Sequence, residues 1–130
     1  MIVGLGIDVM EVARIREVLE RHGENFLSHV FTDSERADAP ENLQAAAAYF
    51  AGRWSAKEAV AKALATGIGA DCAWTDIEIR RENSGRPTVL LSGSGASTAE
   101  RLGITGFILS ISHEKNLACA SVVAENHNFS

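Results

Sequence analysis

Residues 41–65 read ENLQAAAAYFAGRWSAKEAVAKALA, and this stretch organises the rest of the chain. It follows Pro40, which suits the first turn of a helix, and it precedes Gly67 and Gly69, which suit a helix end. At about 25 residues it is long for a small domain, where helices average about three turns. The stretch therefore predicts a central helix against which the other elements pack.

Polar side chains with possible chemistry lie on this helix. Trp54, Glu58 and Lys62 are spaced by four residues and so share one stripe. Spacing alone explains Glu58 and Lys62 equally well as a stabilising ion pair. Lys57 falls on the face expected to be buried, where its stem could cover apolar surface while its ammonium reaches water or a carboxylate. Both interpretations stay open at this point.

The segment before the central helix begins with a strand and a second helix. Residues 2–9 are rich in branched apolar side chains and predict a buried first strand, with Asp8 at its end as a possible cap for the helix that follows. In that helix Val12, Ile15 and Leu19 recur on one face. Gly23 is expected to close it.

Two further features belong to the same region. Arg14, Val18 and Arg21 form a second stripe on the first helix, separate from its apolar face. Thr32, followed three residues later by Glu35, is a candidate helix start.

The segment after the central helix alternates with a period of two. Ile77 and Ile79 begin a strand that turns through residues 83–85 into a second strand at 88–91. A short helix capped by Ser92 or Ser94 should run to Leu102. Strands at 105–112 and 117–124, joined by a polar connection at 113–116, then form a hairpin. The expected class is α+β with a mainly antiparallel sheet, in a single domain covering residues 1–130 with a polar tail at 125–130.

Composition excludes several classes of protein. The chain has 130 residues, 46% of them hydrophobic, which is enough for one core, and its net charge of −5 disfavours a general nucleic-acid binder. No apolar stretch approaches the roughly 20 residues needed to span a bilayer, and no secretory leader is evident, so we expect a cytoplasmic protein. Cys72 and Cys119 are isolated, which argues against a zinc site or disulfides; Cys119 is expected in the core.

Two motifs favour a plain structural interpretation when taken alone. The sequence GSGAST at 93–98 lacks the third glycine of a dinucleotide-binding loop and lies beside strands expected to be antiparallel, so it predicts a turn. His113 lies in a hairpin connection, where an exposed histidine could contact a phosphate or simply face solvent.

Several segments resemble one family, in order and over residues 3 to about 125. The segments are GIDVMEVARI at 6–15, FTDSE at 31–35, FAGRWSAKEAVAKA at 50–63, GRP at 85–87 and SISH at 110–113. Together they are similar to the short bacterial 4′-phosphopantetheinyl transferases, a group that includes the holo-(acyl-carrier-protein) synthases. The co-occurrence of the Trp-Ser-x-Lys-Glu-Ala run with the Gly-Ile-Asp start is highly specific.

The resemblance implies an activity and a metal site. Such enzymes move 4′-phosphopantetheine from coenzyme A to a serine of an acyl carrier protein in fatty-acid biosynthesis, releasing adenosine 3′,5′-bisphosphate. By this resemblance Asp8 and Glu58 hold Mg²⁺ together with the pyrophosphate, and Lys62 stabilises the charge that develops. A cation held by one or two carboxylates plus phosphates is usual for Mg²⁺. The general base could be Glu58 or a metal-bound water.

The resemblance also implies binding residues and an assembly. Arg53 and Lys62 are expected to face coenzyme A phosphates, and Pro87 and His113 to hold the adenylate end, with the active species a homotrimer whose sites combine residues of two subunits. The acidic carrier is expected to dock on Arg14, Val18 and Arg21. Residues 38–48 contain no Lys or Arg, although relatives often carry basic residues there that touch the 3′-phosphate.

Two other functions fit parts of the same sequence pattern. A non-catalytic module that binds carrier proteins would not need Asp8, Glu58 and Lys62. A nucleotide or pyrophosphate hydrolase could use the same metal site to direct water at the phosphate, and would act without a carrier protein.

Overall fold

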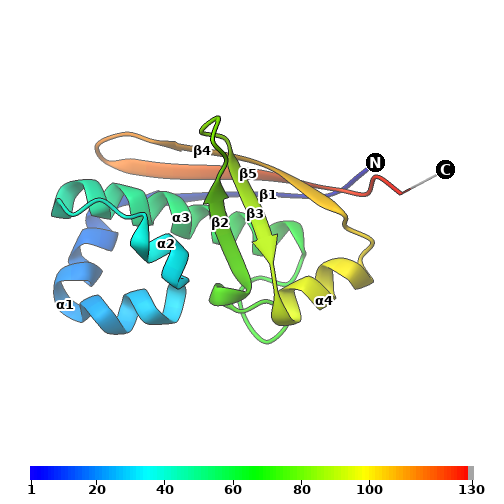
Figure 1. The fold of residues 1–130 in the computed structure, drawn as a ribbon, viewed down its shortest axis with the longest axis horizontal. Coiled ribbons are helices and arrows are strands. Elements are labelled where there is room, and N and C mark those ends of the chain that lie inside the picture. Colours follow the sequence, from blue (N-terminus) through cyan, green and yellow to red (C-terminus); the bar gives the residue numbers. More distant parts are fainter. Residues whose placement is uncertain (129–130) are drawn as a thin grey trace.

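The long helix predicted from residues 41–65 is present as α3 (Leu43–Ala63) in the computed structural model, which describes residues 1–128. It begins later than predicted because Asn42, not Pro40, provides the cap: its side-chain oxygen accepts a hydrogen bond from the N–H of Ala45 at 3.0 Å. After the helix, Ala65 takes a positive φ of 62° and the chain turns away. Figure 1 shows α3 running along the sheet.

The sheet is three-stranded and antiparallel, in the order β1 (Ile2–Glu11), β5 (Leu117–Glu125) and β4 (Gly106–His113). This confirms the predicted α+β class. The expectation of a buried first strand was wrong, because only one face of the sheet is covered by α3. On the other face the first strand exposes large apolar side chains: Leu5, Ile7 and Val9 are 69%, 64% and 58% exposed.

Two glycines let α3 lie directly on β1. A Cβ at Gly6 would stand 1.8 Å from the carbonyl oxygen of Ala59, and one at Gly4 would stand 2.2 Å from that of Ala63. Real Cβ atoms do not approach a backbone oxygen so closely, so no larger residue fits without moving the helix. The glycine of the Gly-Ile-Asp start therefore sets the distance between the strand that carries Asp8 and the helix that carries Glu58.

The first helix, α1 (Val12–Val30), is longer than predicted. Gly23 breaks the regular geometry with φ 19° and ψ −99°, but the chain re-enters a helix and continues to Val30. Thr32 starts the short helix α2 (Asp33–Ala37) with a full capping box formed with Glu35, as the sequence predicted. Asp8 does not cap α1, because β1 continues to Glu11 before the helix begins.

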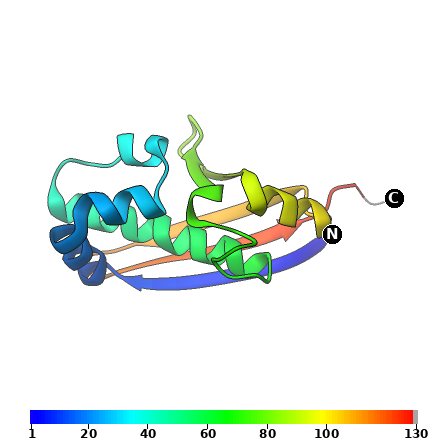
Figure 2. The same ribbon diagram turned by 90° about the horizontal axis from the view of Figure 1, so that it is seen from below.

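The hairpin of β2 (Ile77–Arg81) and β3 (Pro87–Leu91) and the helix α4 (Gly93–Arg101) form the other end of the molecule. The N-terminus of α4 is satisfied by a carboxylate from the 3₁₀ turn η1 (Trp74–Asp76), since Asp76 accepts hydrogen bonds from the hydroxyl of Ser94 and the N–H of Gly95. The 93–98 segment is therefore the start of α4, and its interpretation as a turn was wrong. The predicted serine cap is also absent, because the Ser92 side chain makes no capping hydrogen bond and the Ser94 hydroxyl donates to Asp76. Figure 2 shows α1, α2, this hairpin and α4 on the side of the sheet where α3 lies.

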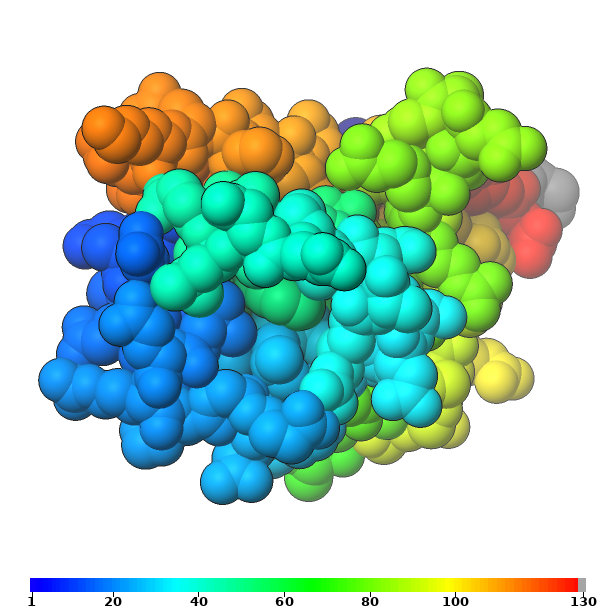
Figure 3. Space-filling view, turned by 60° about the vertical axis from the view of Figure 1, so that its left-hand side comes forward, coloured from blue at the N-terminus to red at the C-terminus, as the bar shows by residue number. Residues whose placement is uncertain are grey.

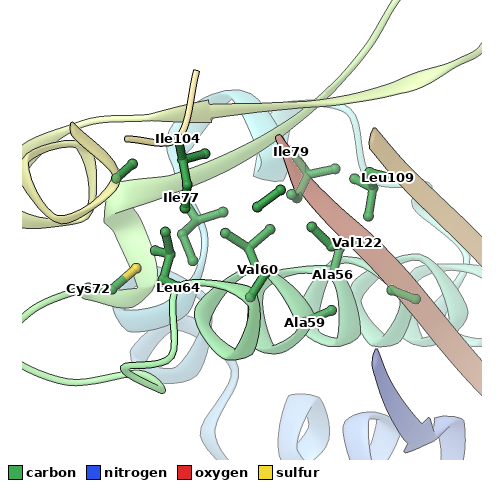
Figure 4. Close-up of a cluster of buried hydrophobic side chains, with 14 residues drawn as sticks. Ala56, Ala59, Val60, Leu64, Cys72, Ile77, Ile79, Ile104, Leu109 and Val122 are labelled. Carbon is green, nitrogen blue, oxygen red and sulfur yellow. The ribbon is translucent and has the colours of Figure 1, made fainter. Parts of the chain in front are cut away.

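The main core lies between α3, the inner face of the sheet and the hairpin (Figure 4). Val60, Ile77 and Val122 are fully buried there, beside Cys72. Cys119, expected in the core, lies half-buried on the outer face of β5, while Cys72 is the buried thiol. Burial raises the pKa of the Cys72 thiol to about 11, which keeps it protonated and unreactive.

The two ends of the chain lie side by side. The N–H of Asn126 donates to the carbonyl of Met1 at 2.8 Å, and Glu125 belongs to β5, so the predicted tail is paired through residue 126. Residues 129–130 of that tail lie outside the described residues. Within residues 1–128, no helix is both long enough and apolar enough to cross a bilayer.

Candidate active site

Asp8 and Lys62, far apart in sequence, meet where β1 crosses α3. The Lys62 ammonium lies 3.2 Å from an Asp8 carboxylate oxygen and donates a second hydrogen bond to the carbonyl of Ile7 at 3.0 Å. The Asp8 side chain is 17% exposed and that of Lys62 is 49% exposed. The pair is therefore open to solvent on one side, where a ligand can reach both charges.

Glu58 lies one helical turn before Lys62 and shares this site. Its side chain is half-buried, and partial burial raises the pKa of its carboxyl; the negative charge of Asp8 raises it further, and the Lys62 ammonium opposes both effects. Two carboxylates that repel each other form a place where added positive charge is favourable. Such a site can hold a cation, either alone or bound to phosphate groups.

The metal-binding capacity of this site is limited to two carboxylates. Within residues 1–128 there is no group of three or more His, Cys, Asp or Glu side chains that could enclose a metal ion. A complete protein cage for zinc or calcium is thus not built here. Two carboxylates suit Mg²⁺, which keeps several waters and takes its other ligands from substrate phosphates.

Lys57, next to Glu58 in sequence, serves a different purpose. Its side chain is fully buried and its ammonium lies 2.7 Å from a carboxylate oxygen of Glu35, itself 1% exposed. The ammonium also donates to the carbonyls of Val30, Trp74 and Ile77, at 2.6 to 3.0 Å. The sequence predicted that the Lys57 ammonium reaches either water or a carboxylate. It reaches a carboxylate, and this carboxylate lies inside the core.

Glu35 is the buried residue that sequence reasoning missed. Its two carboxylate oxygens accept hydrogen bonds from the N–H groups of Thr32 and Ile79 as well as the Lys57 ammonium. The capping-box pattern at Thr32 was a signal for Glu35 at the start of α2, but the pattern carries no information about the long-range contacts with α3 and β2.

Arg53 occupies the opposite flank of α3 from Glu58. The two residues are five positions apart in the helix, which places their side chains about 140° apart around its axis. Arg53 is 5% exposed and its guanidinium lies over the ring of Tyr49, 4.3 Å from the ring centre. The structure therefore does not place Arg53 beside Asp8, Glu58 and Lys62 of the same chain.

Pro87 and His113 also lie away from the Asp8 group. Pro87 begins β3, which contacts β4, and His113 is the last residue of β4 and pairs with Ala118 of β5. Because β5 separates β4 from β1, the expected adenylate residues lie toward the β4 edge and the carboxylates at the β1 edge. His113 is exposed at the end of a strand and not in the connection itself.

The predicted docking stripe forms a continuous surface on α1. Arg14, Val18 and Arg21 line a shallow pocket of about 230 Å³ together with Glu17 and His22. Arg21 pairs with Glu17 at 3.1 Å, with both side chains largely exposed. Arg14 has no ion-pair partner within residues 1–128, so its charge remains available to another molecule.

Comparisons with known proteins identify the relatives of this chain. Residues 4–121 match the model of the 4′-phosphopantetheinyl transferase superfamily. The chain is 44% identical to the holo-[acyl-carrier-protein] synthase of Alkalilimnicola ehrlichii, over 97% of this chain and 98% of that protein. It is 47% identical to the synthase of Desulforudis audaxviator, over 95% and 93%.

Solved structures give the same result. The holo-[acyl-carrier-protein] synthase of Neisseria meningitidis superposes with a TM-score of 0.87 at 32% identity, covering 97% of this chain and all (100%) of that one. The Helicobacter pylori synthase, solved in complex with coenzyme A, gives 0.82 at 30% identity, with 93% and 99% covered. The chain therefore belongs to the 4′-phosphopantetheinyl transferase superfamily and, within it, to the holo-[acyl-carrier-protein] synthases.

Proposed function

We propose that this chain transfers the 4′-phosphopantetheine of coenzyme A to a serine of an apo acyl carrier protein, with Mg²⁺, in fatty-acid biosynthesis. The observation that carries the proposal is the meeting of Asp8, Glu58 and Lys62 at one partly open site. Two carboxylates and an ammonium suit a pyrophosphate with a bound cation. Coenzyme A is a ligand of the Helicobacter pylori relative, which supports it as the substrate here.

Each residue has a separate task in the transfer. The serine oxygen attacks the β-phosphorus of coenzyme A, the bond from that phosphorus to the bridging oxygen breaks, and adenosine 3′,5′-bisphosphate leaves. Asp8 and Glu58 would hold the Mg²⁺, which when bound neutralises charge on the pyrophosphate. Lys62 donates to the phosphate oxygens as negative charge grows on the leaving group. The raised pKa of Glu58 makes it the chain's own candidate for accepting the serine proton.

The test is a mass measurement on a carrier protein. With coenzyme A and Mg²⁺, the wild-type chain should add one phosphopantetheine, while Asp8→Ala and Glu58→Ala should each lose at least about a thousandfold in rate, as expected for residues that organise transition-state charge. Near-normal transfer by either variant would remove that residue from the site. Cleavage of coenzyme A without a carrier would instead favour the hydrolase.

We further propose that the active species is a homotrimer with composite sites. The residues expected at the adenylate end lie on the β4 side and the carboxylates at the β1 edge, which favours a pocket completed by a neighbouring chain. The uncovered face of the sheet, with Leu5, Ile7, Val9 and Ile108 exposed, offers an apolar surface for the neighbouring copies. A repeated head-to-tail contact that closes on itself gives a ring.

Complementation between variants tests the composite site. Glu58→Ala and His113→Ala proteins, each inactive alone, should regain activity after their subunits exchange, because one site in the mixture then carries both native residues. The proposal would be contradicted if light scattering at the assay concentration showed a monomer and that monomer were fully active.

The acidic carrier is proposed to dock on Arg14, Val18 and Arg21 despite the net charge of −5. At physiological salt the Debye length is about 8 Å, so a docked carrier interacts mainly with the arginines near it and little with acidic residues farther away. Arg14→Glu should raise the KM for the carrier about tenfold or more and leave that for coenzyme A unchanged. Arg16→Glu is the matched control, because Arg16 bonds to Glu20 and Gln44. A carrier KM within twofold of wild type for Arg14→Glu would place the docking surface elsewhere.

A further inference from the structure

The Lys62 ammonium is held against β1 by two acceptors. It lies 3.2 Å from Oδ1 of Asp8 and donates a second hydrogen bond to the carbonyl of Ile7 at 3.0 Å. Among residues 1–128, no other side chain forms an ion pair or a hydrogen bond with the Asp8 carboxylate. Lys62 is therefore the cation that this part of the chain itself supplies to Asp8.

Glu58 completes a group of three neighbouring charges. Burial raises the pKa of its carboxyl, the charge of Asp8 raises it further and the Lys62 ammonium lowers it, so both neighbours act on it. Because Lys62 is bonded to Asp8, the protein already balances one of the two negative charges of this group. A metal ion at the same carboxylates thus meets less negative charge than the two acids alone would offer.

Lys62 and a divalent cation compete for the same carboxylate. Mg²⁺ binds carboxylate oxygens at about 2.0–2.1 Å, so an ammonium hydrogen-bonded to Asp8 would lie only a few ångströms from the metal ion. Two positive charges at that distance repel each other. The Asp8 side chain is only 17% exposed, so water screens this repulsion less than it would at an open surface.

A phosphate ligand removes this competition. The Lys62 side chain is 49% exposed, and its flexible stem lets the ammonium turn away from Asp8. The exposed ion pair that it leaves contributes little stability, whereas a phosphate oxygen offers a strong charge-assisted hydrogen bond. Once Lys62 has turned, Asp8 and Glu58 face a cation without an opposing charge between them.

We propose that Lys62 makes metal binding depend on the phosphate ligand: its pair with Asp8 weakens metal binding until a phosphate of coenzyme A draws the ammonium away. The inference rests on the proposed function for the identity of the metal and the ligand. It gives Lys62 a role before the reaction, in addition to its stabilisation of charge during the transfer. Since coupling between two binding events is reciprocal, the metal ion strengthens coenzyme A binding by the same factor.

Binding of Mn²⁺ to the full-length protein tests the proposal without turnover. Mn²⁺ accepts carboxylate and water ligands as Mg²⁺ does, and its free-ion signal in electron paramagnetic resonance decreases when it binds. Without coenzyme A, Lys62→Met should bind Mn²⁺ about tenfold or more tightly than wild type, because a positive charge beside the metal is lost. Lys62→Arg retains that charge and should stay within about threefold of wild type. Adding Asp8→Asn to Lys62→Met should abolish the gain.

The matched control is Arg80→Gln, which removes the same charge from a similar ion pair. Arg80 pairs with Glu78, and the two side chains are 58% and 15% exposed, close to the values for Lys62 and Asp8. Arg80 belongs to the hairpin of β2 and β3, which projects in lime at the surface in Figure 3. The Mn²⁺ affinity of this variant should stay within about twofold of wild type, because no second carboxylate of the site is involved.

Three outcomes would contradict the inference. An unchanged Mn²⁺ affinity in Lys62→Met would overturn it alone, because phosphopantetheine transfer by the wild type does not depend on this competition. An equal gain in Arg80→Gln would also overturn it, because the net charge of the protein would then explain the effect. If the wild type binds no Mn²⁺ even with coenzyme A present, the metal-dependent function proposed above fails as well.

Discussion

Lys57 and Lys62 lie on the same helix, five residues apart, and each contacts a carboxylate, but the two contacts differ in almost every respect. The Lys57–Glu35 pair is 2.7 Å long and both side chains are 0% exposed. The Lys62–Asp8 pair is 3.2 Å long, with side chains 49% and 17% exposed. The first ammonium also donates to three backbone carbonyls, and the second to one.

This difference separates a charge that is enclosed by the protein from one that a ligand can reach. Every acceptor around Lys57 belongs to the protein, so a ligand cannot reach it, and the pair joins the end of α1 and the elements α2, α3, η1 and β2. Lys62 retains exposed surface and a solvent-screened partner, so it can turn toward a phosphate at little cost. Lys57 and Lys62 belong to the same sequence motif, and the difference between them becomes visible only in how deeply each side chain is buried.

Lys57→Met should have the largest effect on stability. Removal of one partner leaves the Glu35 carboxylate buried without its cation, which costs about 3–5 kcal/mol. Urea unfolding followed by circular dichroism measures the loss. The double variant Lys57→Met/Glu35→Met should recover only part of it, because the N–H groups of Thr32 and Ile79 then lose their acceptor. A single variant as stable as wild type would contradict the structural role.

Gly6→Ala should have the next largest effect, since it forces α3 away from β1. The new Cβ would meet the Ala59 carbonyl oxygen at 1.8 Å, and backbone cannot yield as a side chain can. Overpacking of this kind costs about 1–3 kcal/mol. The displacement of Asp8 from Lys62 should also lower the transfer rate. Gly52→Ala is the control: its nearest contact is a methyl group of Ile111 at 3.1 Å, and its stability should stay within about 1 kcal/mol of wild type.

The sequence predicts much of the fold because local signals act within single elements. The Thr32–Glu35 capping box, the alternation of Ile77 and Ile79, and the helix of residues 41–65 all depend on neighbours in the chain, and each is present. The errors arose where neighbours in space decide. Apolar side chains at Leu5 and Ile7 indicate burial, but burial of the outer sheet face requires something beyond a single chain.

The candidate site was predictable in its members but not in its arrangement. The family resemblance named Asp8, Glu58 and Lys62, and the structure brings these three together. It also implied that Arg53 faces coenzyme A phosphates, and helical geometry places that side chain on the other flank of α3. A motif records which residues occur together and not which subunit or flank presents them.

The pH dependence of stability in Glu58→Gln tests whether the Asp8 and Glu58 carboxylates repel each other. Partial burial and the charge of Asp8 raise the pKa of Glu58 above 4.5, so the folded protein holds this proton more tightly than the unfolded chain does. The free energy of unfolding therefore falls as pH rises from 4.5 through the folded pKa. Above that window Glu58→Gln should be the more stable protein, by no more than about 1 kcal/mol, and below pH 4.5 the difference should vanish. Unfolding curves recorded in EDTA at pH 4 and pH 7.5 measure it, and a variant less stable than wild type at pH 7.5 would contradict the repulsion between the two carboxylates.

Lys62→Met should have the smallest effect on stability and so completes the contrast with Lys57→Met. An exposed ion pair contributes about 0.2–1 kcal/mol, and its contribution decreases as salt screens the charges. Loss of the Lys62 ammonium also frees Asp8 to repel Glu58 without opposition, which adds a small penalty, but both carboxylates can still be reached by water. We therefore expect a change in unfolding free energy below about 1 kcal/mol, shrinking further between 0.05 and 0.5 M salt. The same protein should bind coenzyme A more weakly and transfer phosphopantetheine about a hundredfold more slowly, because the lost donor acts on charge that develops in the transition state. Two lysine-to-methionine changes on one helix thus separate stability from catalysis, since Lys57→Met should strongly destabilise the fold and Lys62→Met should leave the protein stable but slow. If Lys62→Met proves as destabilising as Lys57→Met, the exposed pair is structural and the contrast fails.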